Sequence, residues 1–340
     1  MSRAASKTHI PRMVDVAKLA GVSQQTVSRV VNGKENVAPE IRERVDLAIE
    51  QLRYHRNTAA AALASNRTMN LGVVSYALAV HGPSVALFGI SEQARLNGYS
   101  TRLVTLDALD HASIRAALNE LTGNEVDGII VLAPLYAAIE VLRGLDTDLP
   151  VVTFEQGSPP TATSVSIDEV LGARLAVRHL LDLGHKTVWH IEGPAGWMAS
   201  NARRRGWAEE LSLSGRPLPP TVTTADWSAA EGYRAGLELA DNPDVTAVFA
   251  ANDAFALGAV KAFDERGITV PGRISVVGFD DVAEARFFKP SLTTVFLDFE
   301  EIGHLAVERI LTMMRGEESP VIPLIPPRLL VRDSSAAPAQ

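Results

Sequence analysis

The sequence predicts an α/β protein with a small helical head and a larger body in which strands and helices alternate. Charge marks the division: up to Arg67 the chain has 11 Lys and Arg residues against 6 Asp and Glu, whereas the remainder has 21 against 34. The hydrophobic pattern changes between the same two parts. Apolar residues have helical spacing up to Tyr54, and short apolar runs separated by amphipathic stretches follow from Leu71. A chain of 340 residues is long enough for two or three domains.

Composition limits the class of protein. Hydrophobic residues make up 46% and charged residues 21%, as in soluble globular proteins. We expect a cytoplasmic address, because no apolar run reaches the length of a secretory signal or a membrane span. The chain has no cysteine, which excludes disulfides, cysteine nucleophiles and thiolate metal sites. The basic head predicts a polyanionic partner, and neither a metal nor a cofactor is expected.

The head is predicted to contain three short helices. The first covers Val14–Leu19, and Gly21 suits the tight turn that ends it. Ser23 can cap a second helix, and a third begins near Pro39, a residue favoured in a first helical turn. Three helices with a glycine turn between the first two form a helix-turn-helix. The apolar positions that would pack them together are Val16, Ala17, Ala20, Val27, Val30, Val31, Ile41, Val45, Ile49 and Leu52.

The polar side of the second helix predicts contact with DNA. Gln24 and Gln25 match the N6/N7 edge of adenine, and Arg29 matches the O6/N7 edge of guanine. A merely solvated helix face is the alternative, which the basic charge and the turn disfavour. Residues predicted to contact DNA phosphates, which set position but not sequence, are Ser23, Thr26, Ser28, Asn32, Tyr54 and Asn57.

The segment VDVAKLAGVSQQTVSRVVNG, residues 14–33, resembles the DNA-binding segment of the lactose/galactose repressor (LacI/GalR) family. The resemblance implies that Gln24, Gln25 and Arg29 read base edges in the major groove. One recognition helix covers only a few base pairs, so we expect a homodimer on a pseudo-palindromic double-stranded operator.

The segment NTAAAALAS, residues 57–65, predicts a further short helix that Asn57 or Thr58 can cap. A helix of fewer than about 12 residues is marginal in water, so we expect it to fold only on operator. The resemblance implies a hinge helix whose Leu63 wedges between base pairs in the minor groove. A plain helical linker is the alternative. Arg56 departs from the family, which commonly has Pro at this position.

The body is predicted to hold parallel sheets covered by helices on both faces. Helical stretches lie at Val85–Leu96, Ile114–Leu121 and Leu171–Leu183. About 270 residues of alternating pattern suggest two doubly wound subdomains, with a ligand cleft at the carboxyl ends of the strands. The runs that predict buried strands are LGVVSY, STRLVTL, VDGIIVLA, LPVVTF, KTVWHI, VTAVFA and RISVVGF.

The body also resembles the effector domain of the family, which implies a periplasmic-binding-protein-like clamshell. The matching segments are LAVHGPS, RRRGW, DWSAAEGY, ANDAFALGA and ISVVGFDD. The predicted domains are a helix-turn-helix DNA-binding domain at 1–55, a hinge helix and linker at 56–68, and an effector-binding and dimerisation domain at 69–340. Within the last, subdomain N is expected at about 69–166 and 298–324, and subdomain C at about 167–297 and 325–333.

Three candidates for the effector site follow from this resemblance and from position. Arg203 matches a family arginine that reaches ligand hydroxyls, and a surface arginine in a basic trio is the alternative. Asn252 and Asp280 each follow a predicted strand, where a polar side chain can enter the cleft. Helix capping is the alternative for both.

Four further residues complete the predicted site. Trp227 can stack on the apolar face of a pyranose, although an ordinary core tryptophan has the same signature. Glu155 lies just past a predicted strand, and Ser84 and Phe299 lie in or beside segments that match the family. Leu132, Ala199 and Leu297 stand where polar residues occur in the family. Buried polar contacts decide hydroxyl selectivity, so the identity of the effector stays open.

The expected function is therefore a transcriptional regulator, most simply a repressor, that responds to a sugar-like effector. A nucleobase-type co-repressor is the alternative on the same fold. An enzyme acting on saccharides is the other alternative, because Glu155, Asp280 and Asp281 could supply a carboxylate pair. No phosphate loop, nucleophile motif or metal cluster supports catalysis, so we expect no enzyme activity.

Overall fold

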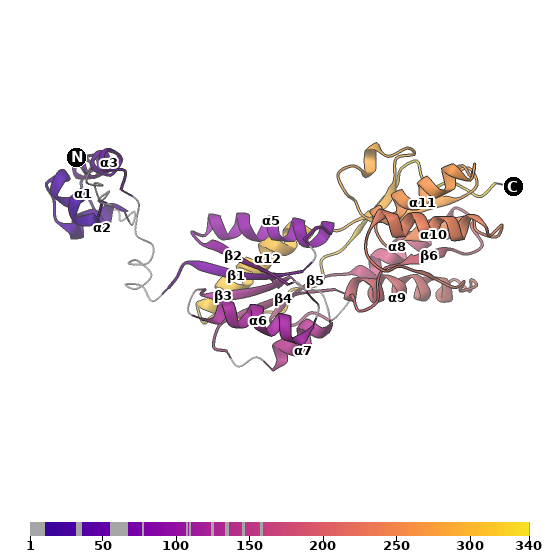
Figure 1. Ribbon diagram of the computed structural model, residues 1–340, viewed down its shortest axis with the longest axis horizontal. Coiled ribbons are helices and arrows are strands. Elements are labelled where there is room, and N and C mark those ends of the chain that lie inside the picture. Colours follow the sequence, from indigo (N-terminus) through magenta and orange to yellow (C-terminus); the bar gives the residue numbers. More distant parts are fainter. Residues whose placement is uncertain are drawn as a thin grey trace, which may run out of the picture. The chain divides into compact units, whose positions relative to one another are not determined.

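The chain divides into two compact units, Met1–Thr68 and Met69–Gln340, here called the head and the body (Figure 1). Asn32, Asn57 and Leu63, and most of the predicted hinge at 56–68, lie outside the residues that the structure describes. The computed structural model describes residues 11–31, 36–54, 67–76, 78–106, 108, 110–123, 126–132, 136–144, 147–156 and 159–339.

The head contains the three predicted helices, α1 (Met13–Ala20), α2 (Gln24–Val31) and α3 (Pro39–Leu52). Gly21 adopts the left-handed conformation, with φ 63° and ψ 40°, and donates its N–H to the carbonyl of Ala17. The glycine turn is thereby confirmed, since a side chain at this φ is strained.

Polar contacts hold the helices of the head at this turn. Ser23 caps α2, because its Oγ accepts a hydrogen bond of 3.1 Å from the N–H of Thr26. Arg44 of α3 donates to the carbonyl of Ala20, which ties α3 to the end of α1. The buried core of the head contains Val16, Ala17, Ala20, Val27, Val30, Val45, Ala48 and Tyr54.

The first sheet of the body has the strand order β2-β1-β3-β4-β5, with every neighbouring pair parallel. Helices α5 and α12 cover one face of it, and α6 and α7 cover the other (Figure 1). We call this sheet with its four helices the first lobe. Its elements are β1 (Asn70–Ser75), α5 (His81–Leu96), β2 (Ser100–Thr105), α6 (His111–Thr122), β3 (Gly128–Leu132), α7 (Tyr136–Arg143), β4 (Val151–Gln156), β5 (Ser164–Ile167) and α12 (Phe299–Met314).

The second sheet has the order β11-β10-β9-β8-β6-β7, and only β11 runs antiparallel to its neighbour. Helices α8 and α9 pack on one face, and α10 and α11 on the other; this sheet and these helices form the second lobe. Its elements are α8 (Glu169–Asp182), β6 (Trp189–Glu192), α9 (Met198–Leu213), β7 (Val222–Thr223), α10 (Ala229–Ala240), β8 (Ala247–Ala250), α11 (Asp253–Glu265), β9 (Ser275–Asp280), the short helix η1 (Ala285–Phe287), β10 (Thr293–Phe296) and β11 (Arg328–Leu330).

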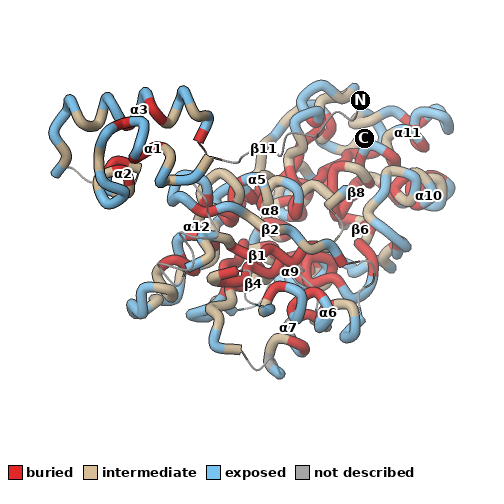
Figure 2. The backbone as a smooth tube through the Cα atoms, turned by 60° about the vertical axis from the view of Figure 1, so that its left-hand side comes forward, coloured by how far each residue is buried: buried red, intermediate tan, exposed pale blue. Residues whose placement is uncertain are grey.

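All seven predicted body strands are present, and the two doubly wound sheets confirm the predicted fold class. Figure 2 shows that the buried stretches of the body follow these strands and the inner faces of the helices. Four short strands lie outside those seven runs: β5, β7, β10 and β11. Among the described residues, no helix is long and apolar enough to cross a bilayer.

The chain passes between the lobes three times, after β5, after β10 and after α12. The first two passages end in matching helix caps: Asp168 accepts from the N–H of Leu171 at 2.9 Å, and Asp298 accepts from the N–H of Glu301 at 3.1 Å. The third passage runs beside the first, because Ile325 exchanges backbone hydrogen bonds with residues 166 and 168. The second passage places α12 in the first lobe, although α12 follows nearly all of the second lobe in the sequence.

Candidate functional sites

The candidate DNA-binding surface is the outer face of α2. Gln24, Gln25 and Arg29 are exposed, whereas Val27 and Val30 are buried against the other two helices. Helical spacing separates the two sets, because residues three and four apart share a face. The structure thus presents all three predicted base-reading residues on one side of the head.

The predicted phosphate contacts occupy different environments. Ser23 is exposed and already serves as the cap of α2, and its hydroxyl lies 2.9 Å from Thr26 Oγ1. Ser28 is half-buried. Tyr54 is only 7% exposed, and its ring packs in the core of the head. Contact of these residues with phosphate stays a prediction.

In the body, Arg203 is the centre of a buried polar cluster. Its Nε donates to Glu169 Oε2 at 2.7 Å, and its Nη2 lies 3.1 Å from Asp280 Oδ1. It also donates to the carbonyl of Ala251. Arg203 is 3% exposed, so it is not the surface arginine of the alternative interpretation, unlike its neighbours Arg204 and Arg205. The cluster joins α8, α9 and the end of β9.

Glu169 and Gln156 also belong to this cluster, although neither is predicted from the sequence. Glu169 is fully buried at the start of α8, and Gln156 at the end of β4 donates to its Oε1 at 2.6 Å. Both follow strands, which is the signal that indicated Asp280. Position after a strand does not identify Glu169, because β5 is too rich in serine to stand out in the sequence as an apolar run.

Burial controls the protonation of the carboxyl groups here. It raises the pKa of Asp280 to about 6, although the guanidinium of Arg203 opposes the shift. It also raises the pKa of Glu169. Two carboxyl groups share one guanidinium in a region of low dielectric, so their charges are only partly compensated.

A third buried carboxyl group lies next to Asp280. Asp253, at the start of α11, accepts from Thr294 Oγ1 at 2.6 Å and from the N–H of Val282 at 2.8 Å. Burial, followed by the charge of Asp280, raises the pKa of Asp253 to about 8. It therefore holds a proton at neutral pH while it fixes the turn after β9.

Asn252 and Asp280 behave differently, although both follow strands. Asn252 caps α11, because its Oδ1 accepts from the N–H of Phe255 at 2.7 Å, as the capping alternative predicts. Its Nδ2 also donates to the carbonyl of Trp227 at 3.2 Å. Asp280 caps no helix and instead has φ 106°, an uncommon conformation that directs its carboxyl group at Arg203.

Trp227 lies beside the polar cluster and is half-buried. It stacks on Phe255 with a centroid distance of 5.6 Å, and the guanidinium of Arg203 lies 5.6 Å from its ring. Its indole N–H is buried without a hydrogen-bond partner among the described residues. Gly193 permits this position, because a Cβ there would come within 2.3 Å of the indole. Trp227 thus packs in the core, as one interpretation predicts, and borders the polar cluster, whereas its stacking on a sugar ring stays a prediction.

The structure does not bring Ser84, Glu155 and Phe299 into the cluster. Ser84 is exposed and donates to the carbonyl of Leu78. Glu155 accepts from Thr153 Oγ1 at 2.9 Å and lies on the opposite face of β4 from Gln156. Phe299 is 2% exposed and packs edge-on against Phe154 in the first lobe, at 6.3 Å.

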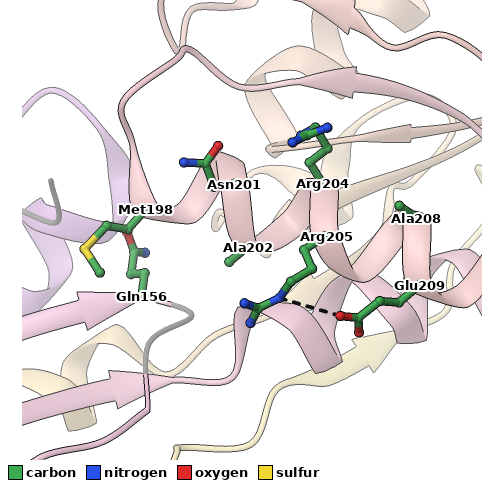
Figure 3. Close-up of a pocket in the computed structure, with 8 residues that line it drawn as sticks. All are labelled: Gln156, Met198, Asn201, Ala202, Arg204, Arg205, Ala208 and Glu209. Carbon is green, nitrogen blue, oxygen red and sulfur yellow. Dashed lines mark ion pairs between the residues drawn. The ribbon is translucent and has the colours of Figure 1, made fainter. Parts of the chain in front are cut away.

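A surface pocket is lined mostly by residues of α9, and Arg203 is not among them (Figure 3). Within it, Arg205 forms an ion pair with Glu209 at 3.7 Å. None of the predicted effector residues lines it, but Gln156 does, and Gln156 is bonded to Glu169 of the buried cluster. The lining residues are Gln156, Met198, Asn201, Ala202, Arg204, Arg205, Ala208 and Glu209.

Known proteins match both parts of the chain. Residues 12–57 match the family of bacterial regulatory proteins, lacI family, and residues 177–335 match a periplasmic binding protein-like domain. The lactose operon repressor of Escherichia coli is 33% identical over 96% of this chain and 91% of its own length. The transcriptional repressor PurR of Haemophilus influenzae is 30% identical over 94% of this chain and 97% of its own. These relatives are repressors, not enzymes.

Solved structures of transcriptional regulators are similar to this chain over nearly its whole length. A lac repressor dimer bound to operator and the anti-inducer ONPF has a TM-score of 0.87 at 33% identity, covering 97% of this chain and all of that one. A complex of the transcriptional regulator CelR with cellobiose has a TM-score of 0.70 at 29% identity, covering 95% and 99%.

Proposed function

The chain belongs to the LacI family of bacterial regulatory proteins, and we propose that it is a sequence-specific repressor whose operator affinity responds to a small carbohydrate-like effector. The observation that carries the DNA-binding part is the outer face of α2, where Gln24, Gln25 and Arg29 are exposed together. Glutamine and arginine are the side chains suited to the edges of adenine and guanine.

We further propose a homodimer on a pseudo-palindromic operator. A recognition helix reads few base pairs, so two heads about one helical turn apart are needed for a site of useful length. The similar lac repressor structure is a dimer on operator, which supports this arrangement. The hinge at 56–68, with Asn57 at a phosphate and Leu63 in the minor groove, belongs to the same proposal.

The effector is proposed to bind between subdomain N, about 69–166 and 298–324, and subdomain C, about 167–297 and 325–333. Asp280 and Asn252 lie at the carboxyl ends of β9 and β8, where ligands bind in such sheets, and Arg203 of α9 reaches Asp280. Trp227 adds an aromatic face for a sugar ring. The similar CelR structure contains cellobiose, which supports a saccharide.

A nucleobase is the second candidate for the effector. The half-buried ring of Trp227 suits a flat, hydrogen-bonding base as well as a pyranose, because its indole N–H has no partner within the described part of the chain. Thermal unfolding of the full chain with monosaccharides, disaccharides and nucleobases separates the two classes. Each compound that stabilises the chain is then tested for its effect on operator affinity.

Base reading is tested with Arg29→Ala on an operator selected from random duplexes by the purified chain. We expect a loss of about 1–3 kcal/mol on the selected duplex and relaxed specificity at one base pair. Arg115→Ala on α6 removes the same charge from the exposed surface of the body and serves as the matched control. An equal loss by Arg29→Ala on selected and scrambled duplexes would show that Arg29 contacts only the backbone.

A further inference from the structure

Trp197 connects aromatic side chains of the two lobes. It stands at the amino-terminal cap of α9, in the second lobe, and is 7% exposed. Its ring meets Trp227 edge-on at a centroid distance of 5.7 Å. It also meets Tyr76, directly after β1 of the first lobe, at 5.9 Å. With Phe255 behind Trp227, four rings form a continuous row from α11 to the end of β1.

The loop before α9 holds Trp197 in this position. Gly196 has φ 87°, a left-handed conformation that turns the chain immediately before the tryptophan. Ser200 Oγ donates to the carbonyl of Gly193 at 2.7 Å and so ties the loop to the first turn of the helix. Gly193 in turn lies flat against Trp227. The orientation of Trp197 is therefore determined by both ends of the loop.

The hydrophobic contacts of Trp197 cross the boundary between the lobes. It is carried by a helix of the second lobe, yet it packs in a cluster otherwise built from the first lobe, including Val74, Ile114 and Leu118. Trp227 packs against this cluster and also against the cluster of α10 and α11. A movement that separates the end of β1 from the start of α9 must break this packing.

We propose that Trp197 is a positioning residue that couples the two lobes by bridging Tyr76 and Trp227. Its importance for regulation rests on the proposed function, because Trp227 borders the proposed effector site. The bridge itself requires neither DNA nor effector. A ligand that moves Trp227 displaces Trp197, and Trp197 transmits that displacement to the first lobe.

The chain offers a matched control on the same helix. Trp207 is also buried, at 2% exposed, but its indole N–H donates to the carbonyl of Val188 at 2.8 Å and its ring stacks on His190. These partners all belong to the second lobe. Substitution of Trp207 therefore disturbs a hydrogen bond and a ring contact within the second lobe and leaves the ring contact between Trp197 and Tyr76 in place.

The experiment measures the distance between the lobes in the full chain, without ligand or DNA. The chain has no cysteine, so Asn119→Cys on α6 and Leu213→Cys at the end of α9 can be spin-labelled specifically. Both positions are exposed. Labelled chains are diluted with unlabelled ones, and the distance distribution is recorded by pulsed electron paramagnetic resonance for each variant.

We expect Trp197→Ala to shift the distribution or to widen it by about twofold, since one inter-lobe aromatic contact is lost. Trp197→Phe retains a ring and keeps the wild-type distribution, as does Trp207→Phe. Tyr76→Leu removes the same contact from the side of the first lobe, and we expect it to reproduce the Trp197→Ala result. It therefore tests the proposal even if the Trp197→Ala chain does not fold. An unchanged distribution in folded Trp197→Ala and Tyr76→Leu, or an equal widening in Trp207→Phe, overturns the proposal.

Operator affinity separates this proposal from the proposed function. If the lobes are coupled as proposed, Trp197→Ala changes operator affinity about two- to tenfold, while Trp197→Phe and Trp207→Phe do not. The proposed function is refuted, and the bridge is kept, if the wild-type chain selects no duplex while the inter-lobe distances respond to Trp197→Ala as expected. The bridge is refuted, and the proposed function is kept, if the wild-type chain binds its operator while the inter-lobe distances do not respond to Trp197→Ala.

Discussion

Asp253 is a buried carboxyl group whose contribution to stability depends on pH. Its pKa of about 8 lies above its ordinary value of 3.8, so the folded chain holds a proton that the unfolded chain releases. The stability that this proton supplies is complete below about pH 4 and is lost as pH rises through 8. Burial of the charged form is the cause, because the neighbouring Asp280 adds repulsion and no cation among the described residues faces Asp253 directly.

The first prediction follows from this protonation. Asp253→Asn has no proton to release when the chain unfolds, so we expect the variant to gain stability relative to wild type as pH rises from about 4 to 8 and to keep that gain at pH 9. The slope of stability against pH between 4 and 8 should fall by up to about 1.4 kcal/mol per pH unit. Urea unfolding at pH 5, 7 and 9 measures it. Asp264→Asn, on the exposed side of the same helix, should leave the slope unchanged.

The sequence does not predict which of two adjacent residues at the end of a strand points into the polar cluster. Position after a strand indicated Asp280, which the turn at φ 106° directs to Arg203. The same rule chose Glu155, but the pleat of β4 turns Gln156 toward Glu169 and Glu155 away. A shift of one residue changes the face, and the register of a strand is decided by its partners rather than by its own sequence.

At the scale of elements, the turn between α1 and α2 is the most sensitive point of the head. Gly21→Ala places a Cβ 2.9 Å from Arg44 Nη2 and forces alanine into the left-handed conformation. We expect a loss of about 1–2 kcal/mol in stability of the head. We also expect weaker operator binding, because Arg44 would leave the carbonyl of Ala20 and the angle of α2 would change. Helical circular dichroism during unfolding and an operator titration measure the two effects.

Gly215→Ala is the control for this second prediction. Gly215 also has φ 63°, but it lies in the body and no atom approaches a Cβ there. The backbone strain is thus the same and the contact is absent. Operator affinity should stay at the wild-type value in Gly215→Ala. Equal loss of operator affinity in both variants would mean that Arg44 does not orient α2.

Elements with apolar runs were predicted well, and those built from polar residues were not. Strands such as β3 and β8 are buried and continuously apolar, so their sequence is distinctive. Strand β10 begins with Thr293 and Thr294, which read as loop residues but are fully buried. Their hydroxyl groups are satisfied by distant partners, Thr294 by Asp253. Such pairings join parts of the chain about forty residues apart, and local pattern cannot contain them.

At the scale of the whole molecule, the edge of the first lobe supports the proposed homodimer. Phe88 and Leu96 on α5 are 61% and 65% exposed, and Leu103 on the edge strand β2 is 41% exposed. Large apolar side chains gathered on adjacent elements are uncommon on monomers and mark interaction sites. An unpaired strand edge beside them offers backbone groups to a second chain.

The last prediction therefore concerns Phe88→Glu, which places a charge in this apolar area. We expect a shift from dimer to monomer, since burying an unpaired carboxylate at an interface is unfavourable. Operator affinity should fall by at least about tenfold, because two linked heads bind at a high effective concentration and single heads do not. Light scattering gives the oligomeric state, and an operator titration gives the affinity. Leu218→Glu, at a position that is 59% exposed in the second lobe, is the control for the added charge. If Phe88→Glu stayed dimeric with full operator affinity, the interface would have to lie on another face of the body.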